Sequence, residues 1–520
     1  MKNTTHAAEN FLTGTPLTID IKSSFEQAQE LFSLAGEELL VLTDGAAFKG
    51  VLRRRVLEEA MRFGLKLDLA DLLEKIPAGE DFSQEALKNP FSAYVLLKKD
   101  SAKSLITLKD AFAFAWEDLS ENFSLEFPEE LSEICTKASE AAKALGLRVF
   151  LVGGIVRDLI LKRPSFDIDL VVTEKARYFA ENLAQKLGAR LVKTSLFGTF
   201  KLAWRDYDID IAQARWEYYE APARLPKTFP GPLRQDAFRR DFTINSLFLC
   251  LKTRRLIDYY GGLKDLCAKK LRVLHILSFV EDPTRIFRAA RYATRFNFAF
   301  SSDTFRALSL ALKLKVLSLL SSARLRNEFL RIMEEENPSL AIIFLAENRV
   351  LNELFEKVPD KFEIKRFFAL ATKMRLSPAE KIEAFALFLA LREKDLERLD
   401  ISGHKKKALW QAKLSLKEKA AFLKDPKIPL SEKVFFLEKM PREALLAASF
   451  LDEAFILKCL KCFEIKPGLS GEDLQKLGVK QGPEIGKMLK ALRAAKIDGT
   501  IKPGEEEAFL RKEFADVFSS

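Results

Sequence analysis

Cysteine and histidine are scarce in this 520-residue sequence, which contains five cysteines and three histidines. The cysteines lack the spacing of a disulfide framework, a pattern typical of a reducing compartment such as the cytoplasm. Cys459 and Cys462 form a lone CxxC pair, but a structural zinc site usually needs four ligands, and the sequence has no second pair. We therefore expect them to be ordinary helix residues.

Long apolar runs are also absent. No stretch reaches the roughly 18 residues that span a membrane, because lysine and glutamate interrupt every candidate. The first residues, MKNTTHAAENFLTG, lack the apolar segment of a secretory signal peptide. The sequence therefore predicts a cytoplasmic protein with no membrane partner.

The composition is that of a folded, basic chain. Hydrophobic residues make up 48% of it and charged residues 30%, which excludes a disordered class. A length of 520 residues allows three or four domains. The net charge of +10 favours a polyanionic partner, although many basic proteins bind nothing anionic.

The stretch 149–172 predicts a strand, a glycine turn, a helix, a loop and a second strand. Gly153 and Gly154 make the turn, and Arg157 lies in the helix that follows. A glycine turn that leads into a helix offers free backbone N–H groups to phosphate oxygens. An ordinary turn without a ligand is the alternative.

Two acidic residues, Asp167 and Asp169, open the second strand of this stretch. Strand side chains alternate between faces, so both carboxylates point the same way. They repel one another unless a cation lies between them, and Mg²⁺ is the expected cation because it shares its oxygen ligands with substrate phosphates. A solvated strand end is the alternative. Only 12 residues separate Gly154 from Asp167, which favours a joint phosphate and metal site.

Two further strands are predicted at 199–204 and 207–212. The second carries Asp208 and Asp210, which lie on one face because they are two residues apart. We expect one of them to complete a carboxylate triad with the first acidic pair. The spacing alone leaves the choice open.

Residues 216–237 are rich in proline, arginine and aromatic residues and predict a long surface loop. The segment RRDFTIN follows, from Arg239 to Asn245, before an apolar run that predicts a helix. Arginine binds phosphate oxygens through two N–H groups, and an aspartate can accept from a ribose hydroxyl. Arg240 and Asp241 therefore suit a triphosphate and ribose site; a capped helix with surface charge is the alternative.

Another helix is predicted to begin with Asp282 as its cap, followed by a proline. Arg285, Arg288 and Arg291 recur every third residue and form a basic ridge with Arg295. Such a ridge is usually a solvated helix face.

In their order, these four motifs resemble those of the nucleotidyltransferase family that holds bacterial tRNA nucleotidyltransferases (CCA-, CC- and A-adding) and bacterial poly(A) polymerases. The resemblance covers about residues 130–300 strongly and 300–515 loosely. It implies an α+β multidomain fold, in which a small mixed β-sheet head precedes an all-α neck, body and tail. It also implies template-independent nucleotidyl transfer to an RNA 3′ end, with release of pyrophosphate.

The resemblance also implies a role for each motif. Asp167 and Asp169 would hold two Mg²⁺ ions, one to activate the primer hydroxyl and one to bind the triphosphate. Asp210 would be the third catalytic carboxylate, although the residues after it depart from the family's pattern and Asp208 stays possible. The implied nucleotide-binding residues are Gly153, Gly154, Arg157, Arg240, Asp241, Asn245, Asp282, Arg285, Arg288 and Arg291.

Asp282 and Arg285 match the family's base-reading pair, and their chemistry agrees. The pairing edges of C and A each show an amino donor beside a ring-nitrogen acceptor, whereas U and G show the reverse. One carboxylate beside one guanidinium therefore suits C and A and leaves wrong partners unpaired, at about 1–3 kcal/mol each. This predicts CTP and ATP as substrates.

The chain is expected to hold four parts. Residues 1–127 form an α/β accessory domain that faintly resembles a CBS-type module, with 92–115 as a degraded second copy. The catalytic head follows at 128–268, the helical neck at 269–345, and the helical body and tail at 346–520.

The end of the chain, from Gly471 to Gly499, resembles the tail of bacterial tRNA nucleotidyltransferases and favours tRNA as the RNA partner. A poly(A) polymerase acting on other RNA is the first alternative. A non-catalytic RNA-binding protein is the second, and the intact carboxylates at Asp167 and Asp169 speak against it. Neither the added nucleotides nor the oligomeric state follows from the sequence.

Overall fold

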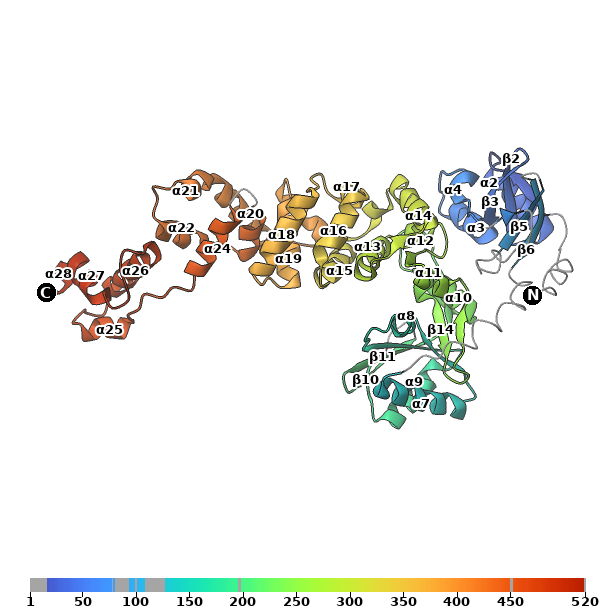
Figure 1. Cartoon of the computed structure of the whole chain (residues 1–520), viewed down its shortest axis with the longest axis horizontal. Helices are drawn as coiled ribbons and strands as arrows, with labels where there is room; N and C mark the ends of the chain where they lie inside the picture. Colours follow the sequence, from blue (N-terminus) through green and yellow to red (C-terminus); the bar gives the residue numbers. More distant parts are fainter. Residues whose placement is uncertain are drawn as a thin grey trace. The chain divides into compact units, whose positions relative to one another are not determined.

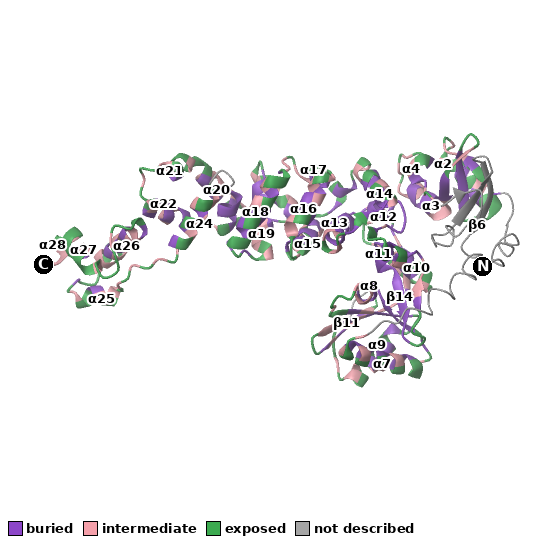
Figure 2. Cartoon of the chain, in the orientation of Figure 1, coloured by how far each residue is buried: buried purple, intermediate pink, exposed green. Residues whose placement is uncertain are grey.

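The computed structural model describes residues 16–76, 78–79, 93–98, 101–107, 127–194, 198–448 and 452–518. The chain divides into two compact units, Met1–Leu320 and Ser321–Ser520, and each is described by itself (Figure 1). Buried residues line the inner faces of the elements in both units (Figure 2). The fold is α+β and multidomain, as predicted.

The first unit begins with a three-stranded sheet and its helices. The elements are β1 (Thr18–Asp20), α2 (Phe25–Ala35), β2 (Leu39–Asp44), β3 (Ala47–Arg53), α3 (Arg54–Arg62) and α4 (Leu69–Leu72). Strands β1 and β2 are parallel, and β2 and β3 form an antiparallel hairpin. The hydroxyl of Ser24 accepts from the N–H of Gln27 and caps α2.

A second small sheet contains β4 (Ala78–Gly79), β5 (Ala93–Lys98) and β6 (Ser101–Thr107). Strands β5 and β6 are antiparallel. The predicted second copy of the accessory motif falls only in part on these strands, because residues 108–115 lie outside the described residues.

Seven strands form the central sheet of the head, in the order β15-β14-β7-β8-β11-β10-β9. Only β8 and β11 are parallel neighbours; every other adjacent pair is antiparallel. The strands are β7 (Val149–Val152), β8 (Asp167–Val172), β9 (Arg190–Thr194), β10 (Thr199–Trp204), β11 (Tyr207–Gln213), β14 (Leu247–Cys250) and β15 (Leu256–Asp258). The strands predicted at 149–152, 199–204 and 207–212 are therefore confirmed.

Three helices accompany this sheet: α7 (Glu129–Ala144), α8 (Gly154–Ile160) and α9 (Ala176–Leu187). Helices α7 and α9 pack on each other and on the strands, and the indole of Trp204 donates to the carbonyl of Leu187 at 2.9 Å. Gly188 ends α9 in the left-handed conformation, as its position predicts. The short helix α8 follows the glycine turn and contacts strands β8 and β14.

The prediction of a long surface loop at 216–237 is wrong. This region contains an antiparallel hairpin, β12 (Arg215–Tyr218) with β13 (Lys227–Pro230), followed by helix α10 (Leu233–Phe238). The rings of Trp216 and Phe229 stack across the hairpin at 4.9 Å. The aromatic residues that obscured a regular pattern in the sequence are thus the ones that pair the two strands.

The prediction of a helix after Asn245 is also wrong. A single short 3₁₀ turn, η1 (Thr243–Asn245), leads directly into strand β14. The four residues of β14 are all buried, and the strand pairs with β7 on one side and β15 on the other. A continuous apolar run of this length fits an interior strand as well as a helix, and here the sheet decides.

The rest of the first unit is mainly helical. Its elements are α11 (Gly262–Cys267), β16 (Lys270–Leu271), α12 (Ser278–Glu281), α13 (Thr284–Phe296), β17 (Ala299–Phe300), α14 (Ser302–Lys313) and η2 (Val316–Leu319). Helix α13 begins at Thr284, so the predicted start at Pro283 is early by one residue.

The second unit is helical throughout its described residues. Its elements are α15 (Ser322–Met333), α16 (Pro338–Glu347), α17 (Val350–Leu354), α18 (Lys361–Lys373), α19 (Pro378–Leu389), η3 (Glu393–Leu399), α20 (Gly403–Glu418), α21 (Ala420–Lys424), α22 (Leu430–Leu437), α23 (Arg442–Ala447), α24 (Glu453–Cys462), α25 (Gly471–Lys476), α26 (Pro483–Asp498), α27 (Glu506–Glu513) and α28 (Ala515–Phe518). Phe385 contacts the rings of Phe329 and Phe367 in its core.

Cys459 and Cys462 lie in α24 as free, buried thiols, as the sequence predicts. Burial raises the pKa of Cys459 to about 12, which keeps this thiol protonated and unreactive. Within the described part of the chain, no helix is both long and apolar enough to cross a bilayer.

Candidate active site

The four aspartates of the two acidic pairs lie side by side at one end of the head sheet. Strands β8 and β11 are parallel, and their register pairs Asp167 with Asp208 and Asp169 with Asp210. Side chains in register on neighbouring strands point to the same face of a sheet. The sequence put each pair on one face, and the sheet brings the two pairs together.

Burial and the neighbouring negative charges raise the pKa of two of these carboxylates, Asp169 and Asp210. Burial raises the pKa of Asp169 to about 6, and the nearby charges of Asp210 and Asp167 act in the same direction against Arg240. Burial also raises the pKa of Asp210, again helped by its acidic neighbours. Over the described residues, no cationic side chain forms an ion pair with Asp169 or Asp210. This donor set therefore suits a divalent cation.

Asp208 differs from Asp210, because its carboxylate already has a cation. Its Oδ2 lies 2.8 Å from Nζ of Lys201 on the neighbouring strand β10. The sequence left open whether Asp208 or Asp210 is the third carboxylate of the site. The structure favours Asp210, because Lys201 neutralises the charge of Asp208.

The glycine turn lies directly against this acidic cluster. Gly153 has φ +72°, a conformation that favours glycine. A Cβ at this position would lie 2.9 Å from Nη1 of Arg240 and 3.4 Å from Oδ2 of Asp169. Any larger residue would therefore push into the acidic cluster or the arginine. The turn, the carboxylate and the arginine of three separate motifs meet at one point.

Asn245 ties the arginine motif to the helix after the turn. Its Oδ1 accepts from Nη1 of Arg157 at 2.7 Å, and its Nδ2 donates to Oδ1 of Asp241 at 2.9 Å. The guanidinium of Arg157 also donates to Asp158 and lies 4.6 Å from the ring centroid of Phe296. Arg157 is therefore committed to internal contacts, and its predicted contact with phosphate stays a prediction.

Asp241 is buried and bound to Arg288 of helix α13. Nε of Arg288 donates to Oδ2 of Asp241 at 2.7 Å. Although burial alone would raise the pKa of Asp241, Arg288 and the amide of Asn245 lower it below its ordinary value. The predicted ribose residue is thus an ionised carboxylate fixed between head and neck.

Arg285 is buried and held by three groups. Its Nη1 donates to Oγ of Ser278 at 2.7 Å, and its Nη2 donates to the carbonyl of Arg239 at 2.8 Å. The hydroxyl of Tyr219 accepts a third, longer bond at 3.4 Å. Asp282 is partly exposed and accepts from the N–H and hydroxyl of Thr284. Arg285 is not on a solvated face, so that alternative is excluded for it.

Comparison with known proteins gives consistent results. The Poly A polymerase head domain model matches residues 149–272. The A-adding tRNA nucleotidyltransferase of Geobacter sulfurreducens is 29% identical over 99% of this chain, and the chain covers 65% of that relative. The chain is thus similar to tRNA nucleotidyltransferases over nearly its whole length, as its motifs predict.

Two solved structures of the family resemble this chain over three quarters of its length. The Thermotoga maritima CCA-adding enzyme complexed with tRNA is 28% identical, with a TM-score of 0.60, and the match covers 75% of this chain and 97% of that one. A CCA-adding enzyme in complex with ATP is also 28% identical, with a TM-score of 0.60, over 75% and 96% of the two chains.

The sequence analysis missed one residue of this candidate site. Asp236 is fully buried and pairs with Arg239 at 2.8 Å and with Arg240 at 3.0 Å. Although burial alone would raise its pKa, the two arginines lower it. Asp236 therefore aims both guanidinium groups. The signal was an acid three and four residues before an arginine pair, a helical spacing that the loop interpretation hid.

Proposed function

We propose that the protein is a template-independent RNA nucleotidyltransferase that adds C, A or both from CTP and ATP to the 3′ end of tRNA. The observation that carries this proposal is the meeting of Gly153, Asp169 and Arg240, where a turn for phosphates, an unpaired carboxylate and an arginine converge. Such a point can hold a triphosphate beside a cation.

The acidic cluster would bind divalent cations, for which we propose Mg²⁺. Asp167, Asp169 and Asp210 are the candidate ligands, since their oxygens have no protein cation within ion-pair distance in the described chain. When bound, such ions lower the pKa of a hydroxyl and neutralise charge on the leaving pyrophosphate. Arg240, aimed by Asp236, would hold a phosphate oxygen at the turn.

Asp282 and Arg285 would select the base. Support comes from the two hydrogen bonds that hold the guanidinium of Arg285 in place. Because this side chain is already ordered, binding a base to it would cost little side-chain entropy. Exchanging the two residues would bury a carboxylate where Arg285 now lies, so milder changes make a better test. Asp282→Asn keeps an acceptor but adds a donor, and should weaken the rejection of U and G.

We propose tRNA as the acceptor for two reasons. The relative described above is named a tRNA nucleotidyltransferase, and one similar solved structure is a complex with tRNA. Poly(A) polymerase on other RNA is the second candidate, favoured by the head-domain match alone.

One assay tests both candidates. Purified protein is offered tRNA that ends before, within or after the CC of its 3′ end, and an unrelated RNA, with each nucleotide singly. Incorporation of A only after CC would identify an A-adding enzyme. Processive addition of A to the unrelated RNA would instead support the poly(A) candidate, and no incorporation on any acceptor would refute the proposal.

A further inference from the structure

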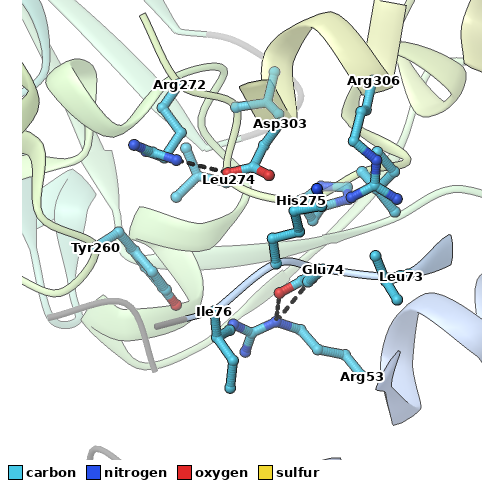
Figure 3. Close-up of a pocket in the computed structure, with 13 residues that line it drawn as sticks. Arg53, Leu73, Glu74, Ile76, Tyr260, Arg272, Leu274, His275, Asp303 and Arg306 are labelled. Atoms are coloured by element: carbon cyan, nitrogen blue, oxygen red, sulfur yellow. Dashed lines mark hydrogen bonds and ion pairs between the residues drawn. The ribbon is translucent and has the colours of Figure 1, made fainter. Parts of the chain in front are cut away.

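Helix α3 of the accessory region contacts the head and neck next to the base-reading segment. The guanidinium of Arg55 lies 4.6 Å from the ring centroid of Phe238, and that of Arg62 lies 4.3 Å from the ring of Tyr218. Figure 3 shows the adjoining pocket, where Arg53 and Glu74 of the accessory region face Tyr260 and His275. All these residues belong to one compact unit.

At this contact, three titratable side chains from two regions are buried together. Glu59 of α3 lies beside His275 and Glu281. One carboxylate oxygen of each glutamate and one ring nitrogen of the histidine all lie within 4.8 Å of one another. Their side chains are 4%, 1% and 2% exposed. Glu281 directly precedes Asp282, the candidate base-reading residue. The accessory region thus reaches into the segment proposed to choose the nucleotide.

One oxygen of each carboxylate lacks a hydrogen-bond donor among the described residues. Oε2 of Glu59 and Oε1 of Glu281 are buried with no hydrogen-bond partner among the described residues. The other oxygen of Glu281 lies 3.3 Å from Nε2 of His275 and 3.8 Å from Nη1 of Arg285. Two buried carboxylates in contact require a proton or a cation between them.

The surrounding charge decides in favour of a proton. Arg55 and Arg62 lie 3.1 and 3.6 Å from Glu59, and Arg285 lies 3.8 Å from Glu281. These three guanidinium groups already outnumber the two carboxylates, so a further divalent cation would enter a positive environment. Burial lowers the pKa of His275 to about 3, so the imidazole stays neutral and does not supply the missing charge.

We propose that Glu59 is a positioning residue for nucleotide selection, which shares one proton with Glu281 and thereby holds Glu281 against Arg285. The inference rests on the proposed function, because it assigns the accessory region a part in the same site. Burial raises the pKa of Glu59 to about 7, so the shared proton is present at pH 6 and is lost as the pH rises above 7. The charged or titratable groups around this pair are Arg55, Arg62, Arg285, His275, Tyr219, Glu74 and Glu217.

The test compares Glu59→Ala and Glu59→Gln in the full chain, at pH 6.5 and 8.5. In the wild type, KM for ATP should rise about tenfold between these pH values, the size expected when a buried polar group loses its partner. Glu59→Ala should show the high KM at both pH values with kcat changed by less than about threefold. Glu59→Gln, whose amide carries its own hydrogen, should keep the low KM at both.

Two control variants separate positioning from general damage. Glu58→Gln changes the exposed neighbour on α3, which forms an ion pair with Arg54 at 2.9 Å. Lys313→Ala removes an exposed accessory–neck ion pair with Asp71 at 2.9 Å. Both should keep the wild-type pH profile, since neither touches the buried carboxylates.

Three results would overturn the inference: an unchanged KM in Glu59→Ala, a wild-type pH profile in Glu59→Gln, or a stoichiometric metal ion in the wild type that is absent from Glu59→Ala. If the wild type incorporates no nucleotide, the proposed function fails. Calorimetric ATP binding by the same proteins then decides the inference, and equal Kd values for the wild type and Glu59→Ala at both pH values would refute it.

Discussion

The head contains two kinds of aspartate with a shifted pKa, and the difference between them supports the proposed position of the metal site. Asp236 and Asp241 each receive arginine side chains, which lower their pKa values despite burial. Among the described residues, no arginine forms an ion pair with Asp169 or Asp210, and burial raises their pKa values. The first pair is completed by the protein itself. The second is not, and this is the property that the proposed site for an external cation requires.

Asp169→Asn should give the largest functional loss. Incorporation should fall by about 10³-fold, because metal-derived charge stabilisation is worth several kcal/mol. Thermal stability should be equal or higher at pH 7.5, since the substitution removes a carboxylate that the fold holds above its ordinary pKa. Radiolabelled nucleotide incorporation and a melting curve measure both effects. Asp206→Asn, in the exposed turn before β11, is the control; retained turnover in Asp169→Asn would contradict the metal assignment.

Arg288→Ala should turn Asp241 into the second kind of aspartate. It leaves a buried carboxylate without its main cation, which costs about 3–5 kcal/mol in the free energy of unfolding. Urea unfolding at pH 7.5 measures the loss. Arg295→Ala, on the exposed side of the same helix, should cost less than about 1 kcal/mol. Equal effects of the two substitutions would show that the Asp241–Arg288 pair is not a special contact.

Local pattern and motif order predicted most of this site. The glycine turn, the acidic strand ends and the RRDFTIN segment were each found from residue type and spacing, and the structure brings them together. The sequence could not show that β8 and β11 are parallel neighbours, because pairing between strands 40 residues apart depends on the whole sheet. It therefore left Asp208 and Asp210 equivalent, although Lys201 distinguishes them in space.

The two wrong predictions, the loop at 216–237 and the helix after Asn245, have related causes. Strand β14 is a four-residue apolar run, and such a run carries no period of its own. The hairpin at β12 and β13 is stabilised by cross-strand aromatic contacts that a single strand does not display. Glu59 escaped notice for a third reason: its partners, Glu281 and His275, lie more than 200 residues away in the chain.

Metal binding should depend on pH in a direction set by Asp169. Its folded-state pKa is about 6, so its carboxylate is ionised at pH 7.5 and protonated at pH 5. Protons and cations compete for this group, and the metal affinity should fall as the pH drops through 6. In the metal-free protein, this acid contributes stability below its ordinary pKa of 3.8 that is lost as the pH rises through 6, so added metal should stabilise most at high pH.

Mn²⁺ is a suitable probe for this dependence, because its binding can be followed by water proton relaxation. The wild type should bind Mn²⁺ about fivefold more weakly at pH 5 than at pH 6, because the ionised fraction of a carboxylate with a pKa of about 6 falls by that factor. Asp169→Asn should show weak binding and a flatter profile. A steep profile that survives this substitution would assign the titration to another carboxylate.

Asp208→Asn should have the smallest effect, and it sharpens the comparison most. Asp208 lies on the acidic face, yet Lys201 makes it resemble Asp236 rather than Asp169. Partly exposed ion pairs of this kind contribute about 0–1 kcal/mol, so incorporation should change by less than about fivefold. Asp210→Asn, two residues away on the same strand, should lose at least about 10²-fold, because no protein cation lies within ion-pair distance of its carboxylate in the described chain. The reverse ranking would make Asp208 the third metal ligand, with Lys201 as a side chain that metal binding displaces.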